Sequence, residues 1–245
     1  RAQVVASLRR DLQNPQSIAG RTWWATSFPD HPYGRSGDGT LESVEAVTAE
    51  DLHAFTDAVL AREDLIVGAV GDISAEELGT LLDRVFGALP AKSNAPTVED
   101  TAPVHSGETI VVDLEIPQSV VVFGQAGIDR EDPDWYTANL LNRVMAGGFG
   151  SRLMEEIREK RGLVYGVWAY LLPLEHAPLV MGGLASQNAR VAEAVGLVRQ
   201  EWERMAEEGP TREELDDART YLLGSFPLSL TDSGGIASIL VSLQE

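Results

Sequence analysis

A proline-rich stretch near the middle of the chain most constrains how it folds. Residues 89–106 contain three prolines, and most of their other side chains are small or polar. Because proline lacks a backbone N–H and holds φ at about −65°, such a run interrupts helices and sheets. It predicts a linker over 93–106, between a first domain at 1–92 and a second domain at 107–245. A chain of 245 residues is long enough for two medium-sized domains.

The part before the linker predicts three helices and one strand. Helical spacing of apolar residues indicates a helix over 1–28, with a break or kink near Pro15, and a second helix over 48–60. A capping box formed by Ser74 and Glu77 opens a third helix, which ends near residue 88. Residues 64–71 form a short apolar run bounded by turn residues, as in a buried strand. A sheet needs more than one strand, so we expect the front of this domain to be missing from the chain.

The part after the linker predicts a mixture of strands and helices. Strands are expected at 109–114, 119–124, 164–172 and 179–185, because these runs are rich in β-branched and aromatic residues. Helices are expected at 133–145, 152–160, 187–207, 212–223 and 232–243. Thr211 and Glu214 form a capping box at the start of the helix over 212–223. Since strands and helices do not alternate strictly, the predicted class is α+β.

Composition excludes several classes of function. The net charge is −19, with 38 acidic and 19 basic residues, so the surface repels phosphate backbones and nucleic-acid binding is not expected. The acidity serves solubility or attracts cationic peptides, and charge alone does not decide between them. The absence of cysteine excludes disulfides and thiolate chemistry. No apolar run reaches the roughly 18 residues typical of a membrane span.

The most informative segment covers residues 142–166 and contains the sequence Gly-Gly-Phe-Gly. A glycine-rich loop before a helix can cradle a phosphate group. Here the loop follows a predicted helix rather than a strand, and the Lys-Ser/Thr pair of a P-loop is absent. The segment therefore argues against nucleotide binding.

The pattern Gly-Gly…Ser-Arg-Leu…Arg-Glu-Lys-x-Gly-Leu-x-Tyr in this segment resembles the C-terminal-domain signature of pitrilysin/insulinase-type zinc metallopeptidases. That family includes the mitochondrial processing peptidase and its bacterial relatives. Residues 117–134 and 31–73 also resemble the family, so the likeness covers nearly the whole chain. The resemblance implies two related domains, each a mainly antiparallel sheet packed with helices, and the first domain is incomplete here.

The resemblance assigns substrate binding to Arg158 and Tyr165. In this family an arginine and a tyrosine seven residues apart help to hold the scissile peptide at a zinc site built by the other half of the enzyme. A guanidinium and a phenol both suit the oxyanion that forms when zinc-bound water attacks an amide. Without the resemblance, the spacing also fits Arg158 in a surface ion pair with a nearby glutamate and Tyr165 packed at a strand end.

The zinc ligands of the family have no counterpart in this sequence. Catalytic members use His-x-x-Glu-His and a distant Glu, and none of the four histidines lies in such a motif: His31, His53, His105 and His176. Alignment on Pro15 places the distant Glu near Ala6 or Ser7, yet residues 1–41 contain no Glu. We therefore expect no metal on this chain and zinc in a partner or in a missing segment.

Together these patterns predict the zinc-less, substrate-binding half of a peptidase. Its expected partners are a peptide or unfolded protein and a zinc-bearing homologous subunit or a second copy. Two alternatives stay open: a fragment of a single-chain zinc endopeptidase, and a structural homologue without a peptidase role. No signal peptide opens the sequence, but Arg1 is not a natural start, and the resemblance favours the bacterial periplasm over the cytoplasm.

Overall fold

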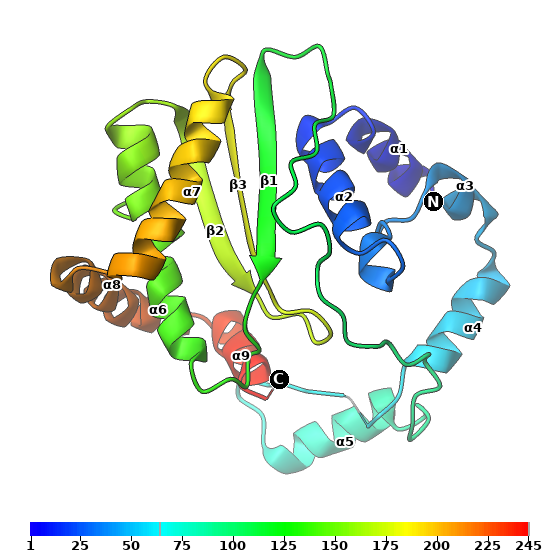
Figure 1. Ribbon diagram of the computed structural model, residues 1–245. Helices are drawn as coiled ribbons and strands as arrows, with labels where there is room; N and C mark the ends of the chain where they lie inside the picture. The colour runs from blue at the N-terminus through cyan, green and yellow to red at the C-terminus, as the bar shows by residue number, and fades with distance from the viewer. Residues whose placement is uncertain (64, 245) are drawn as a thin grey trace. The chain divides into compact units, whose positions relative to one another are not determined.

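The computed structural model describes residues 1–63 and 65–244, which form two compact units. The first, here called the sheet unit, comprises residues 1–45 and 98–219. The second, here called the helical unit, comprises residues 46–97 and 220–245. Figure 1 shows the strands in the first unit and helices in both. The domain boundaries at 92 and 107 stay a prediction.

The sheet unit is built on three antiparallel strands. They are β1 (Gln118–Ala126), β2 (Val164–Leu172) and β3 (Leu179–Gln187), in the order β1-β3-β2. The register sets Val121 opposite Leu184 and Trp168 opposite Gly183. The α+β class and the three strands predicted at 119–124, 164–172 and 179–185 are confirmed.

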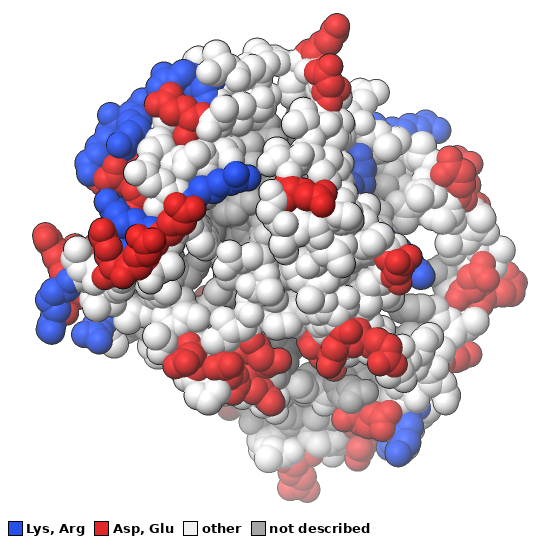
Figure 2. Space-filling model, viewed as in Figure 1, with Lys and Arg blue, Asp and Glu red and all other residues white. Residues whose placement is uncertain are grey.

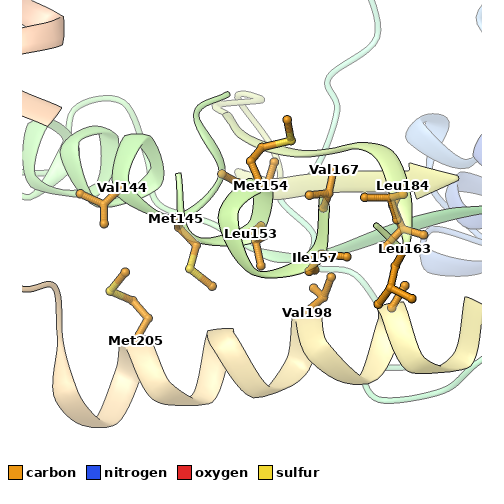
Figure 3. Close-up of a cluster of buried hydrophobic side chains, with 14 of the residues drawn as sticks. Val144, Met145, Leu153, Met154, Ile157, Leu163, Val167, Leu184, Val198 and Met205 are labelled. Carbon is orange, nitrogen blue, oxygen red and sulfur yellow. The ribbon is translucent and has the colours of Figure 1, made fainter. Parts of the chain in front are cut away.

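One face of the sheet packs against helices and forms the main core. The elements on this side include α6 (Trp135–Ala146), the short helix η2 (Met154–Glu159) and α7 (Val191–Glu208). Figure 3 shows Val198 and Met205 projecting from α7 toward Ile157 and Met145. This core holds η2, and with it the predicted site, against the sheet.

The opposite face is covered by α2 (Pro15–Ser27) on the β1 side. Trp23 lies so close to Gly124 that an added Cβ would come within 2.5 Å of its ring. The chain breaks between α1 (Ala2–Asp11) and α2 as predicted, because Asn14 caps α2 by accepting a hydrogen bond from the Ser17 N–H.

Close packing of Trp168 on Gly183 yields a testable prediction. A Cβ at Gly183 would come within 2.6 Å of the Trp168 ring and 3.0 Å of the Val121 carbonyl oxygen. We expect Gly183→Ala to lower the free energy of unfolding by about 1–3 kcal/mol, as overpacked positions do. Urea denaturation measures the change. The matched control is Gly196→Ala inside α7, where an added Cβ meets nothing within 4 Å and a gain of about 0.5–1 kcal/mol is expected; equal stability of the two variants would contradict the packing.

The helices of the helical unit begin at the predicted caps. Thr48 opens α4 (Ala49–Val59) and Ser74 opens α5 (Ala75–Phe86), each in a reciprocal capping box. The other helices of the chain are α3 (Leu41–Ala46), α8 (Arg212–Ser225), α9 (Ser233–Ser242) and the short η1 (Pro32–Gly34) and η3 (Phe226–Leu230). No helix in the described residues is long and apolar enough to cross a bilayer.

Two predicted strands and one predicted helix start differ from the structure. Residues 65–71 form no strand, and residue 64 lies outside the described chain. Residues 109–114 also lack strand pairing. Apolar runs become strands only where a neighbouring strand satisfies their N–H and C=O groups, and these two have none within the described residues. The helix predicted from Pro133 begins at Trp135, with Asp134 as its N-cap.

Candidate functional site

Arg158 is positioned by η2, which is wound more widely than an α-helix. The Lys160 N–H donates to the Glu155 carbonyl at 2.9 Å, a bond spanning five residues, where the sequence predicted an ordinary helix over 152–160. Such π-type turns often occur at functional sites. Leu153 and Ile157 are fully buried and fix the inner side of this segment. The Arg158 side chain keeps 27% of its surface exposed.

Tyr165 follows η2 after a tight turn. Gly162 has φ of +60°, a conformation that glycine adopts without strain, and it turns the chain into β2. The register of β2 with β3 is then irregular between Val164 and Val167. Irregularities of this kind redirect side chains, and Tyr165 is 89% exposed.

The two predicted residues meet at the surface. The Arg158 Cζ lies 5.3 Å from the centroid of the Tyr165 ring and 5.0 Å from that of Phe149. Phe149 stands in the glycine loop, where Gly148 and Gly150 both have positive φ. A guanidinium this close to two rings is attracted to their negative faces. The rings therefore orient the Arg158 guanidinium.

The structure also tests the alternative in which Arg158 forms a surface ion pair with a glutamate and Tyr165 packs at a strand end. Arg158 does form the ion pair with a nearby glutamate: its Nε lies 3.6 Å from Glu159 Oε1, a distance longer than a hydrogen bond. Tyr165 is exposed at the strand end rather than packed there. Sequence reasoning missed Phe149, although a lone aromatic residue between glycines was a signal that could have found it.

Other basic side chains next to Arg158 are neutralised locally. Glu156 accepts hydrogen bonds from Lys160 at 2.7 Å and from Arg161 at 2.6 Å. These bonds, led by the one from Lys160, lower the pKa of the Glu156 carboxyl. Figure 2 shows Lys and Arg side chains gathered at the upper left, over the part of the sheet unit that holds η2 and the first turns of α7. Arg158 itself lies near Glu159 and against the rings of Phe149 and Tyr165.

A row of exposed aromatic side chains continues from the site along β2. Trp168 and Tyr170 flank the buried Ala169, so they point to the face away from α7. Tyr165 precedes the irregularity in β2 and is also exposed. The rings of Trp168 and Tyr170 stack with centroids 5.5 Å apart and an interplanar angle of 16°. Sequence reasoning did not identify this row as part of the site.

A buried ion pair anchors the segment that leads into η2. Arg152 Nη2 donates to Glu214 Oε2 and to the Gly209 carbonyl oxygen, both at 2.8 Å. Arg152 Nε donates to the other Glu214 oxygen. The bonds from Arg152, together with that from the Thr211 N–H, lower the pKa of Glu214 from its ordinary value of 4.5 to about 2. The pair ties the start of the η2 segment to the first turn of α8.

Two of the four histidines lie near the Tyr33 ring, whose centroid is 4.6 Å from that of His31 and 6.5 Å from that of His176. His31 caps η1 and its Nε2 lies 3.0 Å from the Glu99 carbonyl oxygen, while His176 Nδ1 lies 3.1 Å from Asp100 Oδ1. His53 is exposed on α4, and His105 adopts φ of +60° in a turn. Within the described residues no three His, Cys, Asp or Glu side chains come close enough to hold a metal ion. Among the residues of 1–63 and 65–244, the donor groups therefore do not fit a zinc site.

The sequence of this chain matches a known family profile and several known proteins. Residues 46–222 match the sequence profile described as "Peptidase M16 inactive domain". An "uncharacterized zinc protease" of Streptomyces coelicolor is 30% identical over 96% of this chain and 53% of the relative. A "non-peptidase homolog YmxG" of Helicobacter pylori is 30% identical over 93% of this chain and 53% of the relative. The chain thus spans about half the length of the curated relatives it matches.

Solved structures agree with the sequence relatives. A peptidase M16 inactive domain from Pseudomonas fluorescens superposes with a TM-score of 0.88 at 29% identity, covering 99% of this chain and 57% of that one. A chain of complex III2 from Candida albicans shares the fold, with a TM-score of 0.80 at 15% identity, covering 98% of this chain and 59% of that one. The resemblance to pitrilysin/insulinase-type peptidases is confirmed, and the chain belongs to the M16 peptidase family, matching its inactive domain.

Proposed function

We propose that this chain is the substrate-binding, zinc-less half of an M16 peptidase. It holds a peptide at a zinc site supplied by a homologous partner subunit, by a second copy or by a segment outside this chain. The observation that carries the proposal is the partly exposed Arg158 guanidinium, which lies against the rings of Phe149 and Tyr165.

Each residue of the site has a distinct role in holding peptide. The Arg158 guanidinium donates hydrogen bonds to a carbonyl oxygen of the peptide and keeps its charge at every physiological pH. The exposed Tyr165 hydroxyl adds a further donor. The stacked pair of Trp168 and Tyr170 offers an apolar surface for side chains of an extended peptide. All of these contacts bind and orient the peptide without a metal on this chain.

The comparisons support the zinc-less interpretation at the level of the family. The matching profile is described as an inactive domain, and one relative carries the name non-peptidase homolog. Within the described part of the chain, metal-binding side chains do not cluster. Arg158 and Tyr165 nevertheless lie together on the surface, as a binding role requires.

The alternative of a single-chain zinc peptidase is supported by the names and lengths of the relatives. Several relatives are named uncharacterized zinc proteases, and this chain covers only 52–53% of two of them. A single-chain zinc peptidase would carry the metal in the other half. Metal analysis of the full-length protein separates the two cases, because stoichiometric zinc in a single purified polypeptide favours the alternative. A structural homologue without a peptidase role would bind no peptide.

Peptide binding by the chain alone is the direct test. We expect fluorescein-labelled unfolded casein to bind this chain in a fluorescence anisotropy titration, with an affinity that EDTA does not change. Arg158→Ala should weaken binding about tenfold, because hydrogen bonds from a charged donor contribute about 1.5–3 kcal/mol.

The matched control is Arg190→Ala, which removes an exposed arginine that pairs with Glu193 at 3.0 Å. Its affinity should stay within about twofold of the unmodified chain, because exposed ion pairs contribute about 0–1 kcal/mol. Equal affinities for the Arg158 variant and the unmodified chain would remove the proposed role.

A further inference from the structure

The inference concerns the exposed aromatic rings on β2 and the peptide residue that they recognise. It rests on the proposed function, because Arg158 and Tyr165 define the amide from which peptide positions are counted. Outside the sheet, β2 contacts mainly α6 and η2, which lie on the side of the main core. On its other side the rings of Trp168 and Tyr170 stay 44% and 45% exposed. Adjacent exposed rings are typical of a surface that binds a ligand.

The Trp168 ring is fixed in place by two contacts. It lies over Gly183 of β3, where an added Cβ would come within 2.6 Å of the ring. The Tyr170 ring stacks on it with an interplanar angle of 16°. A ring held in this way offers a flat surface that loses little side-chain entropy when a ligand binds.

Gly166 leaves space beside Trp168 on the side of the Arg158 site. It precedes Trp168 by two residues, so both positions face the same side of the strand. An added Cβ at Gly166 would meet no atom within 4 Å. Trp168 therefore has the Tyr170 ring on one side along the row and open space on the other. A further ring can stack on Trp168 from the open side.

Spacing along the strand relates Trp168 to the amide that Arg158 and Tyr165 hold. Three residues of a strand span about 10 Å, at about 3.3 Å per residue. The register irregularity before Val167 adds a residue to β2 and shortens the distance from Tyr165 to Trp168. An extended peptide rises by a similar amount per residue. The Trp168 ring is therefore within reach of a peptide residue two or three positions from the scissile amide.

We propose that Trp168 and Tyr170 select peptides with an aromatic residue two or three positions from the scissile amide. The aromatic side chain enters the space above Gly166 and extends the stack of Trp168 and Tyr170 by one ring. Such stacking adds about threefold to tenfold to affinity beyond the contribution of apolar area. A leucine side chain gains only from the burial of apolar area, so the site prefers an aromatic residue to leucine.

Cleavage of matched peptides by the full-length protein with its zinc-bearing half tests this selectivity. Mass spectrometry first maps the cleavage sites in unfolded casein. Quenched-fluorescence peptides built on one mapped site then carry phenylalanine or leucine at a single position, from the first to the fifth on each side of the cleaved bond. We expect kcat/KM to be about threefold to tenfold higher for phenylalanine at the second or third position on one side. The gain should come chiefly from a lower KM, because contacts far from the reacting atoms bind substrate and transition state alike.

Two variants remove the selectivity in different ways. Trp168→Ala removes the ring and should bring the ratio of kcat/KM for the phenylalanine and leucine peptides to within about twofold of one, while Trp168→Phe should retain the preference. Gly166→Val fills the space beside the ring and should abolish the preference too. An added Cβ there meets no neighbour and the φ of Gly166 is not positive, so this variant is expected to fold. The control is Tyr136→Ala on α6, which removes a ring that is 77% exposed and should leave the ratio unchanged.

Arg158→Ala distinguishes failure of this inference from failure of the proposed function. It should lower kcat/KM for all the peptides by the same factor and leave the ratio for phenylalanine over leucine unchanged. If Arg158→Ala left cleavage unchanged, the proposed function would be wrong. The inference on Trp168 would be overturned if Arg158→Ala slowed every peptide but that ratio stayed below about two at the second and third positions. A ratio that survived in both Trp168→Ala and Gly166→Val would overturn it as well.

Discussion

Replacing Arg158 with alanine is expected to lower kcat/KM for unfolded casein about a hundredfold in the active assembly. The assay uses the full-length protein purified together with its zinc-bearing half and a quenched-fluorescence casein. In the proposed function the guanidinium donates to the oxygen of the scissile amide. Loss of one donor at a developing oxyanion costs about 10²–10³ in rate, and solvent access to Arg158 in the isolated chain favours the lower end.

Tyr165→Phe is the matched variant for the second donor. It removes only the hydroxyl and keeps the ring that lies 5.3 Å from the Arg158 Cζ. A neutral hydrogen bond contributes about 0.5–1.5 kcal/mol, so kcat/KM should fall only about threefold to tenfold. Arg190→Ala should leave turnover unchanged. If Arg158→Ala and Arg190→Ala behaved alike, the binding role of Arg158 would be wrong even where the fold is intact.

A Phe149→Ala variant tests whether the orientation of the Arg158 guanidinium matters for turnover. Its ring lies 5.0 Å from the Arg158 Cζ and belongs to a loop held by positive-φ glycines. Phe149→Ala leaves both hydrogen-bond donors in place but removes one of the rings that orient the guanidinium. Its effect on turnover should therefore fall between those of Arg190→Ala and Arg158→Ala.

Local sequence signals predicted the helices well. The Ser74–Glu77 and Thr211–Glu214 boxes each form the expected reciprocal hydrogen bonds. The chain also breaks before Pro15, where proline begins α2. These features depend on contacts between residues three or four apart, so a single sequence contains the information that they need.

Strands were less predictable because their stability depends on distant partners. Residues 164–172 and 109–114 look alike as apolar, β-branched runs, yet only the first pairs with a neighbour in the structure. Residues 65–71 likewise lack a partner among the described residues. The residue pattern indicates that a segment suits a β-sheet, but it does not indicate whether a neighbouring strand is available to pair with it.

The same distinction between local and distant contacts separates the site residues that were predicted from those that were not. Arg158 and Tyr165 are seven residues apart, and the turn at Gly162 brings them together, so spacing and resemblance sufficed to propose the pair. Phe149 and the row formed with Trp168 and Tyr170 join the site only through the folding of a loop and a sheet edge. The π-type hydrogen bonding of η2 was also not predicted. It accompanies the packing of Leu153 and Ile157 against α7 and the sheet, and these contacts are distant in sequence.

The ion pair of Arg152 and Glu214 should make stability depend on pH in acid. Arg152 is 6% exposed and Glu214 is 25% exposed, and the pKa of Glu214 falls from 4.5 to about 2 on folding. A carboxyl with a lowered folded-state pKa adds stability above its unfolded value and loses it as pH falls. This contribution should thus be complete above about pH 5 and decline between pH 4.5 and about pH 2.

Arg152→Ala and Glu214→Gln test this pair from its two sides. At pH 7 each should lower the free energy of unfolding by about 2–4 kcal/mol, somewhat less than the 3–5 kcal/mol of a fully buried pair, because Glu214 keeps partial access to water. Urea denaturation from pH 7 to pH 3 gives the profile. The difference between Glu214→Gln and the unmodified chain should shrink toward pH 3, because below about pH 4.5 the unfolded chain takes up a proton on Glu214 while the folded chain does not.

Arg190→Ala again supplies the control, because its exposed pair with Glu193 contributes about 0–1 kcal/mol. Its difference from the unmodified chain should stay small at every pH. A difference for Glu214→Gln that kept the same size from pH 7 to pH 3 would contradict a depressed pKa. Since the Arg152 pair fixes the start of the segment that presents Arg158, Arg152→Ala should also weaken casein binding at pH 7, where the Arg158 guanidinium stays charged.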